Sequence, residues 1–319
     1  MSASTDTAAF GSPAPVLSYS PVVLSVPGRP VDLQVRVSAP ATGAGLPVIL
    51  FSHGHGGSNN LSSLNGYAPI ANLWAAAGFV VIQPTHLSSS TLSRQLAGTP
   101  GAPFFWRSRA EDMSDILDRL DEIEKTVPQL AGRIDHNKIA VAGHSLGGHT
   151  AGLLLGARSA DPDTGEEVNL IEPRIKAGVL LAAPGRGGDI LTGPMAEAVP
   201  FFHTTDFSTM TTPTLVVAGD KDDSKHFTDV GPDWHADPYH LAPAPKTLLT
   251  LFGAEHLLGG ISGYDAEETT DENSERVAAV ARLTSAYLRT QLQPGDHAWQ
   301  AACQALMTGA DPAGRVESK

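Results

Sequence analysis

Apolar residues follow two different spacings along the chain, and their alternation predicts the fold class. Leu46 to Phe51 and Phe79 to Ile82 are short, continuous apolar runs, which are typical of strands buried on both faces of a sheet. Between them, apolar residues over 70–77 recur at helical spacing, and Gly78 then marks the end of the helix that this spacing indicates. A buried strand, an amphipathic helix and a second buried strand make one βαβ unit.

The same alternation continues toward the C-terminal end. We expect an amphipathic helix over 113–123 and a final long one over 277–288. Further strands are expected at 139–141, 179–183, 214–218 and 247–252. This repetition of strand and helix predicts an α/β fold with a mainly parallel, doubly wound sheet.

An antiparallel hairpin is expected at the N-terminal edge of this sheet. Apolar and polar residues alternate over 31–37, after a turn at Pro27-Gly28, which indicates strands with one exposed face. No segment between the predicted strands is long enough for a large cap domain, since the stretch 185–212 has the length of one helix with its loops.

The chain length predicts one α/β domain with small additions at its ends. The chain has 319 residues, of which 41% are hydrophobic, enough for one large core. Residues 1–14 are rich in Ser, Ala, Thr and Pro and are expected to be disordered. The domain should cover 15–293. We expect 294–319 to be a C-terminal extension with a short docked helix around Trp299 and Leu306 and a loose end.

Charge and composition exclude several classes of partner. The net charge of −13 repels nucleic acid phosphates and anionic membrane surfaces. No apolar run is long enough to span a bilayer, and the N-terminus lacks the pattern of a signal peptide. The one cysteine, Cys303, permits neither an intrachain disulfide nor a cysteine-based metal site. The sequence therefore predicts a cytoplasmic protein with a small-molecule partner.

The pentapeptide Gly143-His144-Ser145-Leu146-Gly147 lies directly between an apolar strand and a small-residue helix. This G-x-S-x-G arrangement is the signal of a nucleophile elbow, in which a sharp turn exposes the serine hydroxyl in a cleft. The N–H of Leu146, at the helix N-terminus, is then placed to stabilise an oxyanion. The alternative is a glycine-rich turn that only packs the helix against the strand, and the flanking elements disfavour it.

Three further strand ends carry polar groups, and the carboxyl ends of parallel strands meet at one edge of a sheet. The segment 219–223 offers the carboxylates of Asp220, Asp222 and Asp223, and 253–256 offers His256. The order Ser, Asp, His is that of α/β-hydrolases. The glycine-rich loop 53–57 would supply the N–H of His55 as a second oxyanion donor, or would simply be a turn that leaves the sheet.

With these motifs the chain resembles the α/β-hydrolase serine esterases, in the branch of dienelactone-hydrolase-like proteins, chlorophyllases and platelet-activating-factor acetylhydrolases. The resemblance is carried by the segments 51–58, 109–120, 132–148, 215–223 and 251–256. It implies the α/β-hydrolase fold and a serine esterase that cleaves apolar small-molecule esters through an acyl-enzyme, without a cofactor.

The resemblance also assigns roles to single residues. Ser145 would be the nucleophile and His256 the base, while family spacing places the acid at Asp222. True dienelactone hydrolases are expected to carry a cysteine nucleophile, so Ser145 favours an ordinary esterase over their lactone substrate. Thioester, lactone or amide hydrolysis, carbon–carbon cleavage and a non-catalytic binding protein on the same fold remain the alternatives.

Aromatic and histidine side chains gather in the segments that connect the strands. The aromatic residues are predicted to line an apolar substrate pocket, or else to pack the loops down. They are Phe104, Phe105, Trp106, Phe201, Phe202, Phe207 and Trp234, with Tyr239 close by. Four histidines, at positions 53, 55, 144 and 149, lack carboxylate or cysteine companions at metal-ligand spacing, so no metal site is expected.

Overall fold

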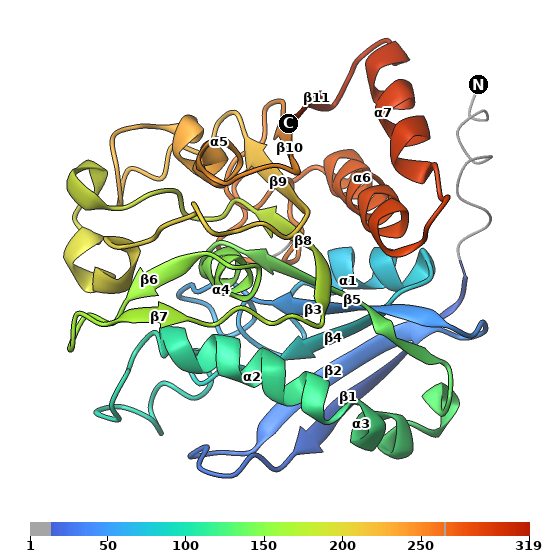
Figure 1. Cartoon of the computed structure of the whole chain (residues 1–319), viewed down its shortest axis with the longest axis horizontal. Helices are drawn as coiled ribbons and strands as arrows, with labels where there is room; N and C mark the ends of the chain where they lie inside the picture. The colour runs from blue at the N-terminus through green and yellow to red at the C-terminus, as the bar shows by residue number, and fades with distance from the viewer. Residues whose placement is uncertain (1–13, 265) are drawn as a thin grey trace.

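The computed structural model describes residues 14–264 and 266–319, and its largest feature is a nine-stranded sheet (Figure 1). The strand order is β1-β2-β4-β3-β5-β8-β9-β10-β11. The bounds are β1 Val16–Leu24, β2 Leu33–Pro40, β3 Leu46–Ser52, β4 Val80–Pro84, β5 Ile134–His144, β8 Ile175–Leu181, β9 Thr214–Gly219, β10 Lys246–Leu251 and β11 Gly314–Ser318. The pairs from β4 through β3, β5, β8 and β9 to β10 are parallel. The predicted mainly parallel sheet is confirmed.

The two outer parts of the sheet are antiparallel. Strands β1 and β2 form the predicted N-terminal hairpin, and β2 pairs antiparallel with β4. At the opposite edge β11 pairs antiparallel with β10, where Val316 lies beside Leu249. The loose C-terminal end expected from the sequence is therefore wrong. An unpaired β10 would present a row of free backbone groups, and the final residues of the chain cover that edge.

Helices pack on both faces of the sheet (Figure 1). One face carries α2 Trp106–Asp118, α3 Leu120–Thr126 and α4 Leu146–Leu154. The other carries α1 Ala68–Ala76, α6 Ser274–Leu292 and α7 Ala298–Thr308. The single helix expected over 113–123 is divided at Arg119, which has φ −117° and ψ 19°.

Strand β3 shows why the buried strands read as continuous apolar runs. Val48 and Leu50 enter the core under α2 and α4, whereas Ile49 and Phe51 enter the core under α1 and α6. Successive side chains of a strand point to opposite faces, and here both faces are covered, so the positions from Leu46 to Phe51 are all apolar.

The connecting segments are short or irregular. Strands β6 Arg158–Ala160 and β7 Glu167–Asn169 form a two-stranded sheet after α4. The segment between β8 and β9 holds the one-turn helices η2 Gly188–Ile190, η3 Ala196–Ala198 and η4 Pro200–Phe202. Helix η1 Pro128–Leu130 precedes β5, and η5 Pro232–Ala236 and α5 Asp237–Leu241 lie between β9 and β10.

The two ends of the chain differ in how the structure describes them. The expected disorder of residues 1–14 falls outside the described residues, apart from Ala14, whose N–H donates to the Ala76 carbonyl at 3.2 Å. The predicted docked helix near the C-terminus is α7, where the Trp299 ring meets the Tyr287 ring of α6 edge to face at 5.4 Å.

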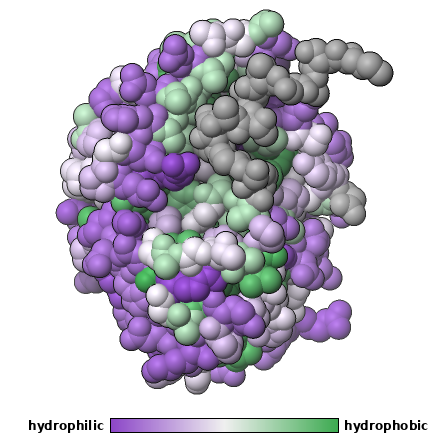
Figure 2. Space-filling view, turned by 90° about the vertical axis from the view of Figure 1, so that its right-hand side faces the viewer, coloured by the Kyte–Doolittle hydropathy of each residue, from purple (hydrophilic) through white to green (hydrophobic). Residues whose placement is uncertain are grey.

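Figure 2 shows the side of the molecule that carries α1, α6 and α7, where hydrophilic residues cover the margins and hydrophobic ones gather near the middle. Helices α1 and α7 carry the exposed apolar residues Leu73 and Met307. Among the described residues, no helix combines the length and the apolar character that a membrane span requires.

Candidate active site

Ser145 occupies a one-residue turn between β5 and α4. Its backbone has φ 54° and ψ −122°, a conformation that residues other than glycine rarely adopt. The turn needs glycine on both sides, because a Cβ at Gly143 would lie 1.9 Å from the Gly147 carbonyl oxygen. A Cβ at Gly147 would lie 2.0 Å from the Ser52 carbonyl oxygen of β3. The structure thus contains the strand, sharp turn and helix that the motif predicts.

The end of β9 places a single carboxylate beside His256. Asp222 is 3% exposed, and its Oδ2 accepts a hydrogen bond from His256 Nδ1 at 2.7 Å. Asp220 instead accepts a hydrogen bond from the Gly253 N–H, and Asp223 pairs with Lys225 at the surface. Of the three carboxylates that the sequence offers here, only Asp222 is in contact with the histidine.

Charge polarises the contact between Asp222 and His256. Burial by itself raises the pKa of Asp222, but the neighbouring His256 and His235 lower it well below its usual range. Burial lowers the pKa of His256, but the charge of Asp222 and its hydrogen bond raise it above the usual value. The carboxylate therefore favours a positive charge on the His256 ring.

His144, inside the pentapeptide, ties three loops together. Its Nε2 lies 2.8 Å from the His256 carbonyl oxygen, which can only accept, so Nε2 carries the proton. Its Nδ1 then accepts from the Tyr67 hydroxyl at 2.7 Å, and that hydroxyl oxygen accepts from the Gly54 N–H at 3.0 Å. Burial lowers the pKa of His144 to about 3, which fits this neutral form. The ring is a structural link between the loops.

Ser145 and His256 line one cavity of about 420 Å³, together with His55 and Leu146, the two predicted oxyanion residues. Leu146 begins α4, so its N–H belongs to the first helical turn, where amide groups have no partner within the helix. The walls are mainly apolar, with Glu268 and His226 as further polar members. The apolar lining residues are Phe104, Pro184, Met195, Val199, Phe202, Phe227 and Leu257.

Of the aromatic residues predicted to form the pocket, Phe104 and Phe202 line this cavity. Trp106 and Phe201 stack on each other behind its wall, with ring centroids 5.7 Å apart. They support the lining residues and do not belong to them.

The other predicted pocket residues lie elsewhere, which corrects the expectation from the sequence. Phe105 packs against Leu87 and Leu96. Phe207 and Tyr239 belong to the hydrophobic core on the face of the sheet that α2, α3 and α4 cover. Trp234 is 1% exposed and donates to the Arg186 carbonyl at 2.9 Å. Irregular segments also need apolar side chains to fix them to the body, and these aromatics serve that purpose.

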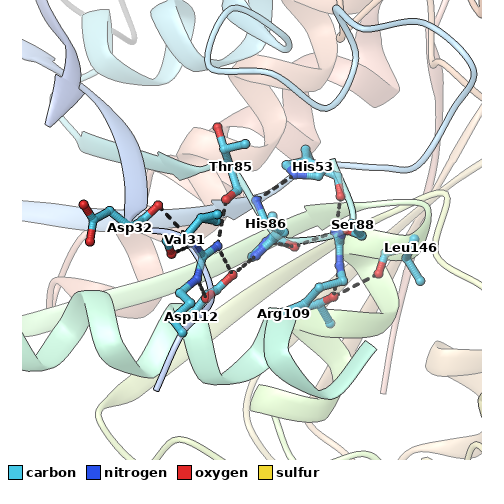
Figure 3. A network of polar contacts seen from close by, with 12 residues as sticks. Val31, Asp32, His53, Thr85, His86, Ser88, Arg109, Asp112 and Leu146 are labelled. Carbon is cyan, nitrogen blue, oxygen red and sulfur yellow. Dashed lines mark hydrogen bonds and ion pairs between the residues drawn. The ribbon is translucent and has the colours of Figure 1, made fainter. Parts of the chain in front are cut away.

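A buried arginine connects the loop after β3 with α4 (Figure 3). Arg109 is fully buried and donates to Thr150 Oγ1 at 3.0 Å, to Ser88 Oγ at 2.5 Å, and to the His53 carbonyl. Thr150 in turn donates to the Leu146 carbonyl at 3.1 Å. One guanidinium therefore holds both segments that carry the predicted oxyanion residues.

A second group of charged and polar side chains lies on one side of this arginine (Figure 3). Asp112 accepts from Arg29 Nε at 2.8 Å and contacts His86 Nδ1 at 2.8 Å. Burial lowers the pKa of Arg109 to about 9, while the charge of Asp112 acts in the opposite direction. In the sequence, Arg109 belongs to the helical segment 109–120, which is one of the segments that carry the family resemblance. The sequence predicted no role for Arg109 itself.

His235 is a further residue that sequence reasoning missed. It is 1% exposed in η5, and its Nε2 lies 3.1 Å from Asp222 Oδ2, the same oxygen that contacts His256. No motif marks it, because it lies in an irregular segment between β9 and β10. A histidine that follows Pro-Asp-Trp matches no functional motif, and only the fold brings it into contact with the Asp222 carboxylate.

Asp222, His235 and His256 form the group of described residues nearest to a metal-ligand arrangement at this site. A tetrahedral Zn²⁺ with bonds of about 2.0–2.1 Å holds its ligand atoms about 3.3 Å apart. The contact between Asp222 and His256 is 2.7 Å, which is a hydrogen-bond length. The geometry suits shared protons better than a metal ion.

Neither a protein-family model nor a curated protein sequence matches this chain.

Replacing Arg109 with lysine should lower the free energy of unfolding by about 2–5 kcal/mol. Lysine cannot reach Thr150, Ser88 and the His53 carbonyl together, and each buried acceptor left without a donor costs roughly 1–3 kcal/mol. Urea unfolding measures the change. Arg107→Lys on the same helix is the matched control, because Arg107 is 54% exposed, and it should change stability by no more than about 0.5 kcal/mol. Equal effects of both variants would refute the network's importance.

His149 should make the protein sensitive to acid. Its two ring nitrogens are buried without a partner, and burial lowers its pKa from 6.5 to about 3. The unfolded chain therefore binds this proton first, so the stability is complete above pH 6.5 and declines as the pH falls toward 3. His149→Leu should reduce that decline by up to about 1.4 kcal/mol per pH unit, measured by urea unfolding at pH 7 and pH 5. His136→Leu at an exposed position is the control; an unchanged decline in His149→Leu would contradict the assignment.

Proposed function

We propose that this protein is a serine hydrolase that cleaves carboxylic esters of apolar small molecules through an acyl-enzyme on Ser145. The observation that carries the proposal is one cavity lined by both Ser145 and His256. The Nδ1 atom of the His256 ring is hydrogen-bonded to the buried Asp222. Because Nδ1 donates to Asp222, Nε2 is the nitrogen available to take a proton from the serine hydroxyl.

The proposed reaction has two halves. Ser145 Oγ attacks the ester carbonyl carbon while His256 Nε2 takes the hydroxyl proton, and Asp222 stabilises the imidazolium that forms. The N–H groups of Leu146 and His55 stabilise the negative oxygen. The carbon–oxygen bond to the alcohol then breaks, and His256 returns its proton to the leaving oxygen. Water repeats these steps on the acyl-enzyme, so the chemistry requires no cofactor.

We further propose that the fold is the α/β-hydrolase fold. In support, the serine follows β5 in a strand–turn–helix, and the acid and the histidine follow β9 and β10, in the chain order of that superfamily. The apolar walls of the cavity favour an apolar substrate. Thioesters, lactones and amides would use the same groups, while no contact favours a non-catalytic role. The lone cysteine, Cys303, supports a reducing, cytoplasmic location.

Ser145→Ala should abolish ester hydrolysis, since loss of a serine nucleophile typically lowers kcat by several orders of magnitude. The assay is release of p-nitrophenol from a series of p-nitrophenyl esters of increasing acyl length, with circular dichroism to confirm that the variant is folded. A serine-directed phosphonate should label Ser145 in the unmodified protein, as seen by peptide mass spectrometry. Substantial turnover by the folded variant would rule out the serine mechanism.

Asp222→Asn should lower kcat by about four orders of magnitude, because an amide fixes the wrong His256 tautomer. Asp220→Asn and Asp223→Asn are the matched controls, since neither carboxylate contacts His256, and both should stay within a few-fold of the unmodified protein. Steady-state kinetics on one ester separates the three variants. A larger loss at Asp220 or Asp223 would show that the acid is assigned to the wrong residue.

A further inference from the structure

The buried His235 has an environment that the proposed reaction does not explain. Its Nδ1 lies 2.8 Å from the Ala183 carbonyl oxygen. Its Nε2 lies 3.1 Å from Asp222 Oδ2 and 2.8 Å from Ser224 Oγ, while Ser224 Oγ also lies 3.1 Å from Asp222 Oδ1. Asp222 is thus held by two histidines and one hydroxyl.

The number of available protons decides the form of His235. The Ala183 carbonyl can only accept, so Nδ1 carries a proton. If Nε2 carried none, its lone pair would face Asp222 Oδ2, and the single Ser224 proton could serve only one of its two partners. If Nε2 is protonated, it donates to Oδ2 and Ser224 donates to Oδ1. The second arrangement leaves none of these atoms unpaired, and an unpaired buried polar atom is costly.

The charge of Asp222 favours a positive His235 ring, whereas a proton on the His256 ring, 5.6 Å away, opposes it. Asp222 is ionised, and His144 is neutral because burial lowers its pKa to about 3. Burial also lowers the pKa of His226, whereas it raises the pKa of Asp237, which binds the Arg186 N–H. The titratable groups that interact with His235 are Asp222, His226, Asp237, His144 and His256.

We propose that His235 is a positioning residue that stays protonated on both nitrogens, holds the Asp222 carboxylate and shares its negative charge with His256. The rings of His235 and His256 are 5.6 Å apart. At that distance the positive ring of His235 opposes a second proton on His256. His256 then becomes a base at a lower pH than Asp222 alone would permit. The catalytic role of His235 rests on the proposed function. The protonation of His235 is independent of that function.

Nitrogen NMR of the ¹⁵N-histidine-labelled full chain tests the protonation directly. We expect one histidine whose two ring nitrogens are both protonated in the folded protein at neutral pH, and whose signals disappear in His235→Gln. A His235 signal with one unprotonated nitrogen would overturn the proposal. This experiment needs no substrate, because the number of protons is read on the unmodified protein and His235→Gln serves only to assign the signals.

The effect on His256 is tested by removing the charge. His235→Gln keeps an amide donor but loses the positive charge, so the pH at which His256 titrates should rise by roughly one unit. Ser224→Ala is the matched control, because it removes a neutral donor from the same carboxylate and should leave this midpoint unchanged. The midpoint is measured by NMR and, where an ester is turned over, by the pH dependence of kcat/KM.

The outcomes separate the two proposals. A raised midpoint in His235→Gln and an unchanged midpoint in Ser224→Ala support the role of His235. Equal midpoints in all three proteins would reduce His235 to a packing residue and overturn the proposal. Absence of turnover with every ester would refute the proposed function, while the NMR titration of His256 would still decide the role of His235.

Discussion

The structure depends on one close approach, where β5, α4 and β3 meet around Ser145. Neither Gly143 nor Gly147 has space for a methyl group, because a Cβ at either position would overlap a backbone carbonyl. The turn also forces Ser145 into a strained backbone conformation. Such strain persists only when the surroundings fix it, and here two parallel partners of β5 and the helix α4 do so. The position of Ser145 in the wall of the cavity is a consequence of this packing.

Buried polar groups then fix the segments around that turn. A polar group without a partner inside a protein is costly, so a buried guanidinium such as that of Arg109 must satisfy its donors on whatever lies nearby. Its partners belong to the loop after β3, the segment after β4 and helix α4. On the other side, Asp222 binds two histidines, one before and one after β10. Hydrogen bonds and ion pairs thus connect the segments that surround the candidate site.

The sequence by itself determined the elements whose pattern is local. Continuous apolar runs predicted the buried strands, since a strand covered on both faces is mainly apolar, as β3 shows from Leu46 to Phe51. The spacing of Gly143, Ser145 and Gly147 predicted the sharp turn, because the steric requirement lies within five consecutive residues. The order of Ser145, the acid and His256 along the chain was also visible. These features need no knowledge of which distant segments touch.

Only the tertiary structure decided the contacts between distant segments. Three aspartates lie within four residues after β9, and the turn there directs Asp222 alone to His256. The polar end of the chain has no apolar pattern, and it becomes β11 because the edge of β10 needs a partner. The roles of Arg109 and His235 arise in the same way. The hydropathy and spacing of residues in the sequence indicate burial and local geometry. The hydrogen-bond partner of a side chain depends instead on how the whole chain packs.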